Sequence, residues 1–343
     1  MKVGMGVRGP ARVNKEHIQY LAQIGAPHAV VFMPDKELFP DSGVGPWSVD
    51  ELVALKKFYA ENGVKIEGFE NFHPSLHYKV LLDLPGKEKQ LDDVKRCIEN
   101  MGKAGIKVMG YNLSIAGVTG LEPATARGGA KTVRFDSKTA PINGSMPLGT
   151  VFNRIVMPDA PEGDLPFVSL EEMLQRRDWA LSQLIPVAEE AGVIMAAHPD
   201  DPPVPVMKNT SRILINKERY DELFAKYDSP SNCIEFCQGV FGESGVDVYD
   251  AIRYFAGKKK IGYVHFRNII GTVKDSYTEV FIDEGDMDMV KSLQAYKESG
   301  YTGLLMPDHT PLVSVEPANE IGMAYAIGYI RGIMQTLDID IED

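Results

Sequence analysis

Four residues with metal-binding side chains end four consecutive apolar segments of the chain. His198, Cys237, His265 and Asp308 each lie at or within one residue of the end of a short run rich in β-branched and apolar side chains. Two imidazoles, a thiolate and a carboxylate can together hold a divalent cation and leave room for substrate oxygens. The sequence therefore predicts a metal centre, provided that the four segments end side by side.

Each of these residues has an ordinary structural interpretation when it is taken alone. A single histidine at a strand end often makes only a hydrogen bond, and a single cysteine is usually a small buried apolar side chain. Four such residues at four successive segment ends favour the metal site. The ligand types do not fix the metal, because thiolate and imidazole suit Zn²⁺ or Fe²⁺ whereas carboxylate suits Mn²⁺.

Residues beside these ligands offer proton transfer and substrate binding. His309 directly follows Asp308, and an imidazole near the metal is suited to general acid–base work. Its structural alternative is a hydrogen bond that supports the ligands. Arg267 and Asn268 follow His265, and we expect them to bind a carboxylate and hydroxyl groups, since arginine offers a planar pair of donors. A surface salt bridge is the alternative for Arg267.

Two further polar residues follow predicted strands on the same side. Asp200 lies in a proline-rich run after His198, where it could orient an imidazole or cap a turn. His73 follows the third apolar run and could meet the substrate. We count both among the candidate substrate-binding residues.

The elements that must position these side chains alternate regularly along the chain. Eight short apolar runs predict strands, and the segments between and after them have helical periodicity. The strands are expected at residues 2–7, 28–32, 65–70, 107–113, 193–198, 232–237, 261–266 and 303–308. The helices are expected at residues 15–25, 49–62, 87–104, 170–191, 217–226, 248–256, 287–299 and 316–337. Eight such pairs favour an α/β fold of the (β/α)₈ TIM-barrel type over an open doubly wound sheet.

One segment interrupts the alternation. Residues 114–168, between the fourth strand and its helix, are rich in Gly, Pro and Thr and are too long for a plain connection. We expect an inserted loop or lid over the barrel mouth, with a purely structural excursion as the alternative. The whole chain, residues 1–343, is interpreted as a single barrel domain.

Composition excludes several classes of partner. The formal net charge of −12 argues against a surface built to bind nucleic acid, whose ligands are clustered Lys and Arg. No apolar run approaches the roughly 18 residues that a membrane-spanning helix needs. There is no signal-peptide pattern at the N-terminus, and three cysteines offer no disulfide framework. We therefore expect a cytoplasmic protein that binds neither nucleic acid nor membrane.

At these residues the sequence resembles the mannonate dehydratase family, within the xylose-isomerase-like barrels. The similarity spans most of the chain, is weaker through residues 104–112 and 133–136, and is strongest in the second half. Its best-matching stretches are residues 195–203, 237–239, 264–268, 281–288 and 307–309.

The resemblance implies roles for particular residues. His198, Cys237, His265 and Asp308 correspond to the family's Mn²⁺ or Fe²⁺ ligands, with Zn²⁺ not excluded by the ligand types. Two further matches, His309 and Tyr325, correspond to its acid–base residues, and Asn112 is added as a substrate contact. The implied reaction is the dehydration of D-mannonate, a small sugar acid, to 2-keto-3-deoxy-D-gluconate by a lyase that forms homo-oligomers.

Two loops leave an alternative open. Residues 113–120 and 72–77 differ from the family's usual sequence after the fourth and third strands. A metal-dependent isomerase or epimerase, or another β-eliminating lyase acting on a different carbohydrate, is therefore the second hypothesis, because the barrel and metal can support any enolisation.

Overall fold

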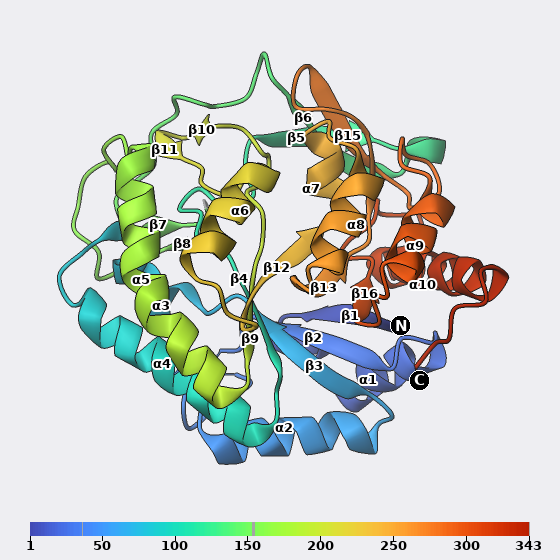
Figure 1. Cartoon of the computed structure of the whole chain (residues 1–343), viewed down its shortest axis with the longest axis horizontal. Coiled ribbons are helices and arrows are strands. Elements are labelled where there is room, and N and C mark those ends of the chain that lie inside the picture. The colour runs from blue at the N-terminus through green and yellow to red at the C-terminus, as the bar shows by residue number, and fades with distance from the viewer. Residues whose placement is uncertain (36, 153–154, 343) are drawn as a thin grey trace.

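The eight predicted strands close into a parallel barrel. A computed structural model of the chain describes residues 1–35, 37–152 and 155–342, and Figure 1 shows the strands at its centre with helices around them. The order around the barrel is β1, β16, β13, β12, β9, β4, β3 and β2. These strands are β1 (Lys2–Arg8), β2 (His28–Phe32), β3 (Lys65–Glu70), β4 (Val108–Tyr111), β9 (Ile194–Ala197), β12 (Asn232–Cys237), β13 (Ile261–His265) and β16 (Leu304–Met306). The predicted TIM-barrel fold is confirmed.

A helix lies in every connection between consecutive barrel strands. The helices are α1 (Lys15–Gln23), α2 (Val49–Glu61), α3 (Pro74–Leu82), α4 (Lys87–Ala104), α5 (Leu170–Ala191), α6 (Lys217–Lys226), α7 (Gln238–Glu243), α8 (Val248–Gly257), α9 (Met289–Glu298) and α10 (Ala318–Thr336). Within the described ranges, no helix is both long and apolar enough to cross a bilayer.

Local sequence signals set several helix ends. The Ser169 hydroxyl accepts a hydrogen bond from the N–H of Glu172, whose carboxylate accepts one from the N–H of Ser169. This reciprocal cap satisfies two donors that the first turn leaves free. Gly192 ends the same helix with a φ of 65°, in the left-handed region that glycine adopts at little cost. Strong caps explain why the sequence predicts the bounds of α5 so closely.

Apolar side chains fill the interior of the barrel. One buried cluster joins residues from strands on opposite sides, namely Val30, Phe32, Ala196, Tyr263, Leu304 and Met306. Gly110 of β4 leaves space for the side chains of Tyr263 and Glu235. A Cβ atom at position 110 would lie 2.1 Å from the Tyr263 hydroxyl oxygen and 2.7 Å from Glu235 Oε2. The middle of the barrel is therefore a packed apolar core, and its polar side chains lie toward the two ends.

Two short helices differ from the sequence prediction. Helix α3 follows β3 and buries seven of its nine residues, so it has no polar face that periodicity could reveal. His73 caps this helix and Pro74 is its first residue, a position where the missing N–H of proline costs nothing. Helix α7 has only six residues and starts directly after Cys237, which is too short for a periodic pattern.

A second sheet forms beyond the carboxyl ends of the barrel strands. Its order is β14 (Asn268–Gly271), β15 (Ser276–Val280), β6 (Lys131–Asp136) and β5 (Leu121–Thr125), with antiparallel pairing throughout. Figure 1 shows β6 of the segment after β4 beside β15 of the segment after β13. The segment predicted as an inserted loop therefore contains strands that pair with a distant part of the chain. Its action as a lid stays a prediction.

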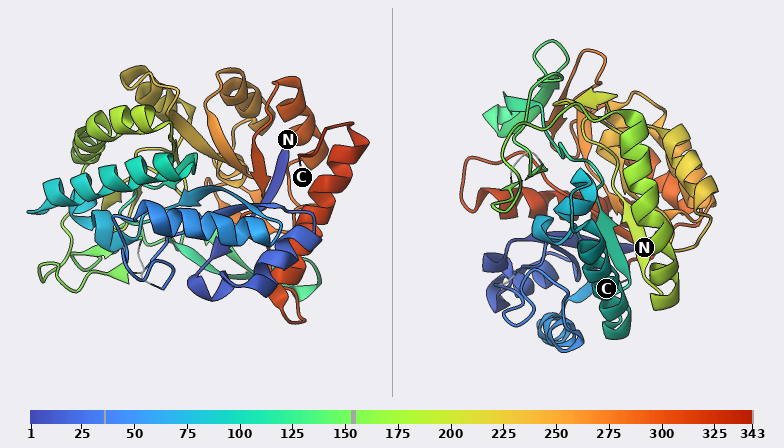
Figure 2. Two further views of the ribbon diagram at one scale, coloured as in Figure 1. Left: turned by 90° about the horizontal axis from the view of Figure 1, so that it is seen from below. Right: turned by 90° about the vertical axis from the view of Figure 1, so that its left-hand side faces the viewer.

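Polar contacts join the strands at the amino-terminal end of the barrel. The His28 ring is fully buried, and its Nδ1 lies 2.6 Å from Glu67 Oε1 while its Nε2 lies 2.9 Å from the Glu342 carbonyl oxygen. The Lys2 ammonium donates to Glu67 Oε2 at 2.9 Å. Figure 2 shows the first and last residues of the chain close together in this region. These contacts stabilise the end of the barrel remote from the predicted metal centre.

Candidate metal centre

Three predicted ligands converge at the carboxyl ends of the barrel strands. His198 directly follows β9, and Cys237 and His265 are the last residues of β12 and β13. One ligand atom from each lies within 4.8 Å of the others. The strand pairing brings this about, because Cys237 and His265 stand opposite each other in the parallel register. A single ion could contact all three side chains.

Asp308 approaches the same cluster from a strained loop. It follows β16 with a φ of 61°, a left-handed conformation that is uncommon outside glycine and often marks a functional site. Its Oδ2 lies 3.4 Å from His265 Nδ1, and Arg8 donates to its Oδ1 at 2.5 Å. The carboxylate therefore lies beside the histidine but outside the mutual 4.8 Å group that the three other residues form.

The electrostatic surroundings favour the thiolate form of Cys237. Burial of this side chain opposes ionisation, but the Arg267 guanidinium and hydrogen bonds from His198 and His265 outweigh burial and lower the pKa of the thiol to about 5. Burial also opposes protonation of His198, yet the nearby Glu235 carboxylate and Cys237 raise the pKa of the imidazole to about 9. Because the thiolate is the form that binds metals, the donor set fits a divalent cation.

Two buried carboxylates that the sequence analysis did not predict lie behind the cluster. Glu235 Oε1 is 3.0 Å and Glu70 Oε2 is 3.2 Å from His265 Nε2. Tyr263 donates its hydroxyl to Glu70 at 2.9 Å. Burial, and then the charge of Glu70, raise the pKa of Glu235 to about 8. Strand periodicity could have revealed Glu235, because it is two residues before Cys237 and shares its face.

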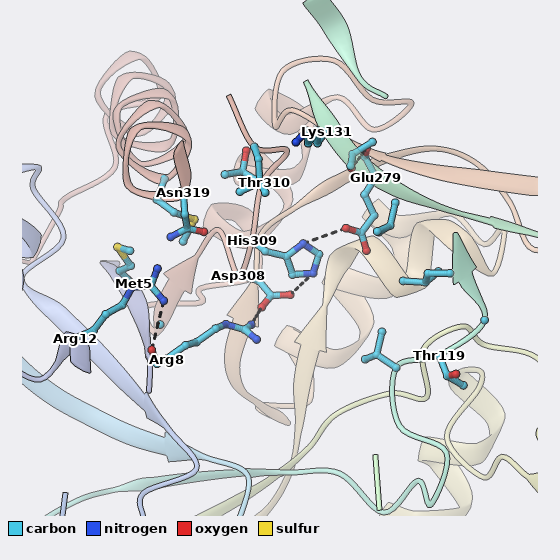
Figure 3. A pocket seen from close by; sticks show the side chains of 18 residues that line it. Met5, Arg8, Arg12, Thr119, Lys131, Glu279, Asp308, His309, Thr310 and Asn319 are labelled. Carbon is cyan, nitrogen blue, oxygen red and sulfur yellow. Dashed lines mark hydrogen bonds and ion pairs between the residues drawn. The ribbon is translucent and has the colours of Figure 1, made fainter. Parts of the chain in front are cut away.

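His309 lies between two carboxylates at the edge of the site. Figure 3 shows its ring with Glu279 on one side and Asp308 on the other. The Nδ1 atom is 3.1 Å from Glu279 Oε2, and the Nε2 atom is 3.1 Å from Asp308 Oδ2. Burial opposes protonation of this ring, but the two carboxylates raise its pKa to about 10. Glu279 belongs to β15 of the second sheet, a strand that the sequence did not predict.

Arg267 is engaged by buried acidic groups. Its Nη1 donates to Glu243 and its Nη2 to Asp201, both at 2.9 Å. Tyr277 donates its hydroxyl to the other oxygen of Asp201 at 3.0 Å. All four side chains are buried or nearly so. The guanidinium therefore stabilises this network and the Cys237 thiolate. The predicted contact of Arg267 with the substrate stays a prediction.

Asn268 and Asp200 also use their polar atoms within the protein. The Asn268 amide donates to the carbonyl oxygens of Ile282 and Met287, and its oxygen accepts from the Met287 N–H. Asp200 Oδ2 accepts from the N–H groups of Ile213 and Leu214. Both residues are buried and hold the loops that surround the candidate metal ligands.

The remaining predicted site residues lie at different distances from the centre. Asn112 lines the same cavity as His198 and His265. His73 caps α3 and binds the Ser75 hydroxyl at 2.7 Å, and it lines neither of the two cavities described below. Tyr325 lies on α10, 43% exposed, and it is likewise absent from the walls of both cavities.

Two cavities meet at the metal-ligand cluster. The inner cavity, of about 210 Å³, contains His198 and His265 in its wall, and the outer cavity, of about 570 Å³, opens beside it. Both are lined by Arg8, Val118, Asp308 and His309. Ligand pockets in proteins have sizes of this order. The candidate acid–base residue therefore faces both spaces.

Comparisons with known proteins identify the family. The model of the D-mannonate dehydratase (UxuA) family matches residues 17–342. The chain belongs to this family. A curated mannonate dehydratase of Halalkalibacterium halodurans is 27% identical over 353 residues, covering 98% of this chain and 99% of the relative. One of Thermotoga petrophila is 29% identical over 324 residues, covering 85% of this chain and 87% of the relative.

Solved structures support the fold of this mannonate dehydratase family member. A mannonate dehydratase from Streptococcus suis serotype 2 is 22% identical, with a TM-score of 0.79, and the match covers 100% of this chain and 97% of that chain. A D-psicose 3-epimerase from Clostridium cellulolyticum H10 is 13% identical, with a TM-score of 0.61, and the match covers 97% and 99% of the two chains. At these identities the similarity concerns the barrel and not the reaction.

Proposed function

We propose that this protein is a metal-dependent hydro-lyase that converts D-mannonate to 2-keto-3-deoxy-D-gluconate and water. Membership of the family and the names of its curated relatives support the reaction. The observation that carries the proposal is the convergence of His198, Cys237 and His265 within 4.8 Å at the carboxyl ends of the barrel strands, where enzymes of this fold place their active sites.

We infer that these three residues and Asp308 hold the metal, with Mn²⁺ or Fe²⁺ as the expected ion and Zn²⁺ as a further option. The thiolate character of Cys237 and the neighbouring Asp308 carboxylate support this ligand set. A bound divalent ion would polarise the substrate carboxylate and an adjacent hydroxyl, which lowers the cost of removing the proton next to the carboxylate.

His309 is the proposed proton-transfer residue on the cavity side. The reaction removes the hydrogen on carbon 2 and the hydroxyl on carbon 3, and the enol that forms rearranges to the 2-keto product. Both ring nitrogens contact carboxylates, Nδ1 with Glu279 and Nε2 with Asp308. Nε2 is on the side of the candidate metal ligands and is therefore the proposed proton-transfer atom. Tyr325 remains the second acid–base residue on the strength of the resemblance alone.

Substrate binding is assigned to polar groups that reach the cavities. Arg8 lines both cavities and Asn112 lines the inner one, so their donors could bind a carboxylate or hydroxyl groups. The predicted roles of Arg267, Asn268 and Asp200 are better supported as positioning roles, because their polar atoms are bound within the protein.

The test is turnover by metal-reconstituted protein. The chain, stripped of metal and loaded with Mn²⁺ or Fe²⁺, is incubated with D-mannonate, and the 2-keto-3-deoxy product and deuterium uptake from heavy water are measured. Dehydration is expected. Deuterium uptake without loss of water would contradict the proposal and favour an isomerase or epimerase, the second hypothesis.

A pair of cysteine variants tests the ligand assignment. Cys237→Ala should weaken metal binding more than about a hundredfold, since loss of even a supporting residue costs up to that much. Cys233→Ala is the matched control, because Cys233 is buried in the same strand but its Sγ faces the Pro230 carbonyl oxygen. Metal content is measured by mass spectrometry of the dialysed proteins. An unchanged stoichiometry and affinity in Cys237→Ala would disprove the assignment.

We also propose that the protein is cytoplasmic and forms homo-oligomers. Cys97, Cys233 and Cys237 are free thiols, as is usual in a reducing compartment. Four exposed apolar side chains lie close together in the sequence around the start of α10, namely Leu312, Val315, Ile321 and Tyr325. Exposed apolar surfaces often mark contacts between subunits.

A further inference from the structure

The outer cavity extends the candidate active site beyond the metal ligands. It is lined by residues of β1, β6 and α10, by the segments 118–121 and 308–312, and by Arg12 and Glu279 of β15. Its volume of about 570 Å³ exceeds the roughly 210 Å³ of the inner cavity and lies within the range of pockets that bury a drug-sized ligand. A substrate that reacts beside His309 could therefore extend into it.

Cationic side chains line this cavity. Arg8, Arg12 and Lys131 all line it, but they differ in how far their charges are compensated. Arg8 donates one N–H group to Asp308 at 2.5 Å, which places its charge beside the candidate metal ligands. Arg12 donates to one oxygen of Glu320 through Nε at 3.1 Å and Nη2 at 3.0 Å, and its Nη1 donates to the Arg8 carbonyl oxygen at 3.4 Å, so its charge is compensated within the protein. No described acidic group lies within 4.0 Å of the Lys131 ammonium, so its charge is available to a ligand.

The positions of these cations relate them to the reacting end of the site. Figure 3 shows Arg12 and Lys131 away from the Asp308 carboxylate, with Thr310 and Asn319 between them in this view. Thr310, Asn319 and Thr132 also line the cavity and offer hydrogen-bonding groups. A ligand whose reacting carbons lie at His309 would thus direct its far end toward cations and neutral polar groups.

We propose that the outer cavity is a subsite for a second anionic group at the far end of the sugar acid, bound by Lys131. The inference rests on the proposed dehydratase function and goes beyond it, because it adds sugar acids with a second anion to the substrates of the same site. The shared chemistry is a terminal anion, which a hexarate supplies as a carboxylate and a 6-phosphohexonate supplies as a phosphate. D-mannonate itself carries a neutral hydroxymethyl group at this end.

The test compares binding of three probes by titration calorimetry to metal-loaded protein. The probes are D-mannonate, the corresponding hexarate and the corresponding 6-phosphohexonate. At least one dianion should bind about tenfold more tightly than D-mannonate, the effect of one charge-assisted contact. Lys131→Met should abolish that preference. Tighter binding of the hexarate alone or the phosphate alone identifies the anion.

Lys138→Met is the matched control, because Lys138 follows the same strand, is exposed and does not line the cavity. The Lys138→Met variant should keep the preference for a dianion over D-mannonate. Equal binding of D-mannonate and both dianions by the parent protein would overturn the subsite, and so would an equal loss of preference in both lysine variants. Turnover measured in parallel separates the two proposals: selective binding without dehydration of any probe leaves the subsite intact and removes the dehydratase function.

Discussion

The two ring nitrogens of His309 are held by different carboxylates, one from the barrel and one from the second sheet. Asp308 follows β16 and is itself a candidate metal ligand, whereas Glu279 comes from β15 and contacts the side of the ring remote from Asp308. Such a contact fixes the orientation and tautomer of an imidazole. At the residue scale, Glu279 therefore determines which nitrogen of His309 faces the substrate.

Glu279→Gln should lower kcat about tenfold to a hundredfold, a part of what a positioned general acid–base contributes. The amide keeps the shape of the side chain but removes the charge that stabilises the His309 imidazolium, whereas KM should change little. Steady-state kinetics with D-mannonate measure both constants. Glu122→Gln is the control, because Glu122 lies in the same sheet and pairs with Arg134 at its surface. A wild-type kcat in Glu279→Gln would exclude this role.

Residue types and spacing predicted the cluster but not the partners of each side chain. His198, Cys237 and His265 could be identified because a parallel barrel must bring consecutive strand ends together. Arg267 follows His265 by two residues in the sequence, yet its guanidinium binds Asp201 in the loop after β9 and Glu243 at the end of α7. Sequence position does not give side-chain direction beyond a strand end, so a substrate role and a supporting role could not be separated.

At the scale of elements, the barrel strands were predictable because each is a buried apolar run bounded by helices with their own caps. β15 was not, since it is short and pairs with β14 on one side and on the other with β6, which is far away in the sequence. Glu279 was not among the predicted site residues because it lies in β15. The long segment before α5 was recognised by its composition, but composition carries no information about its pairing partner.

The amino-terminal end of the barrel gives a stability prediction at this scale. Burial opposes ionisation of Glu67, but hydrogen bonds from His28 and Lys2 outweigh it and lower the pKa of the carboxyl. The ionised Glu67 carboxylate therefore stabilises the folded protein by its whole amount at pH values above the ordinary pKa of about 4.5. This stabilisation is lost as the pH falls through the lower pKa that Glu67 has in the folded protein. Glu67→Gln should reduce the free energy of unfolding by about 1–2 kcal/mol at pH 7.

Urea unfolding of both proteins across the acidic range measures this difference. The gap between the parent protein and Glu67→Gln should narrow as the pH falls below 4.5, because the parent carboxyl then becomes neutral as well. A Glu61→Gln variant serves as the control, since Glu61 makes only an exposed contact with Lys57 at 3.7 Å. A pH-independent gap would show that the charge of Glu67 does not stabilise the barrel.

At the scale of the whole molecule, the proposed assembly of subunits can be tested by mass. Light scattering should give a multiple of the 37.9 kDa chain, and Val315→Lys should shift the protein toward the monomer, because Val315 is 59% exposed in the apolar segment before α10. Val246→Lys, a substitution of a 41% exposed valine between α7 and α8, is the control. A monomeric parent protein would contradict the proposal.

The pairing of β6 with β15 joins two parts of the chain that sequence order keeps far apart. Lys131 of the proposed subsite and Glu279 beside His309 lie on these neighbouring strands. The backbone hydrogen bonds of such a sheet open and close as a unit. Hydrogen exchange of its amides therefore slows in both strands when a ligand binds to one of them. Binding of the far end of a substrate and the orientation of the His309 ring would thus depend on the same opening equilibrium. A molecule that does not contact β6 would leave the His309 ring less rigidly positioned.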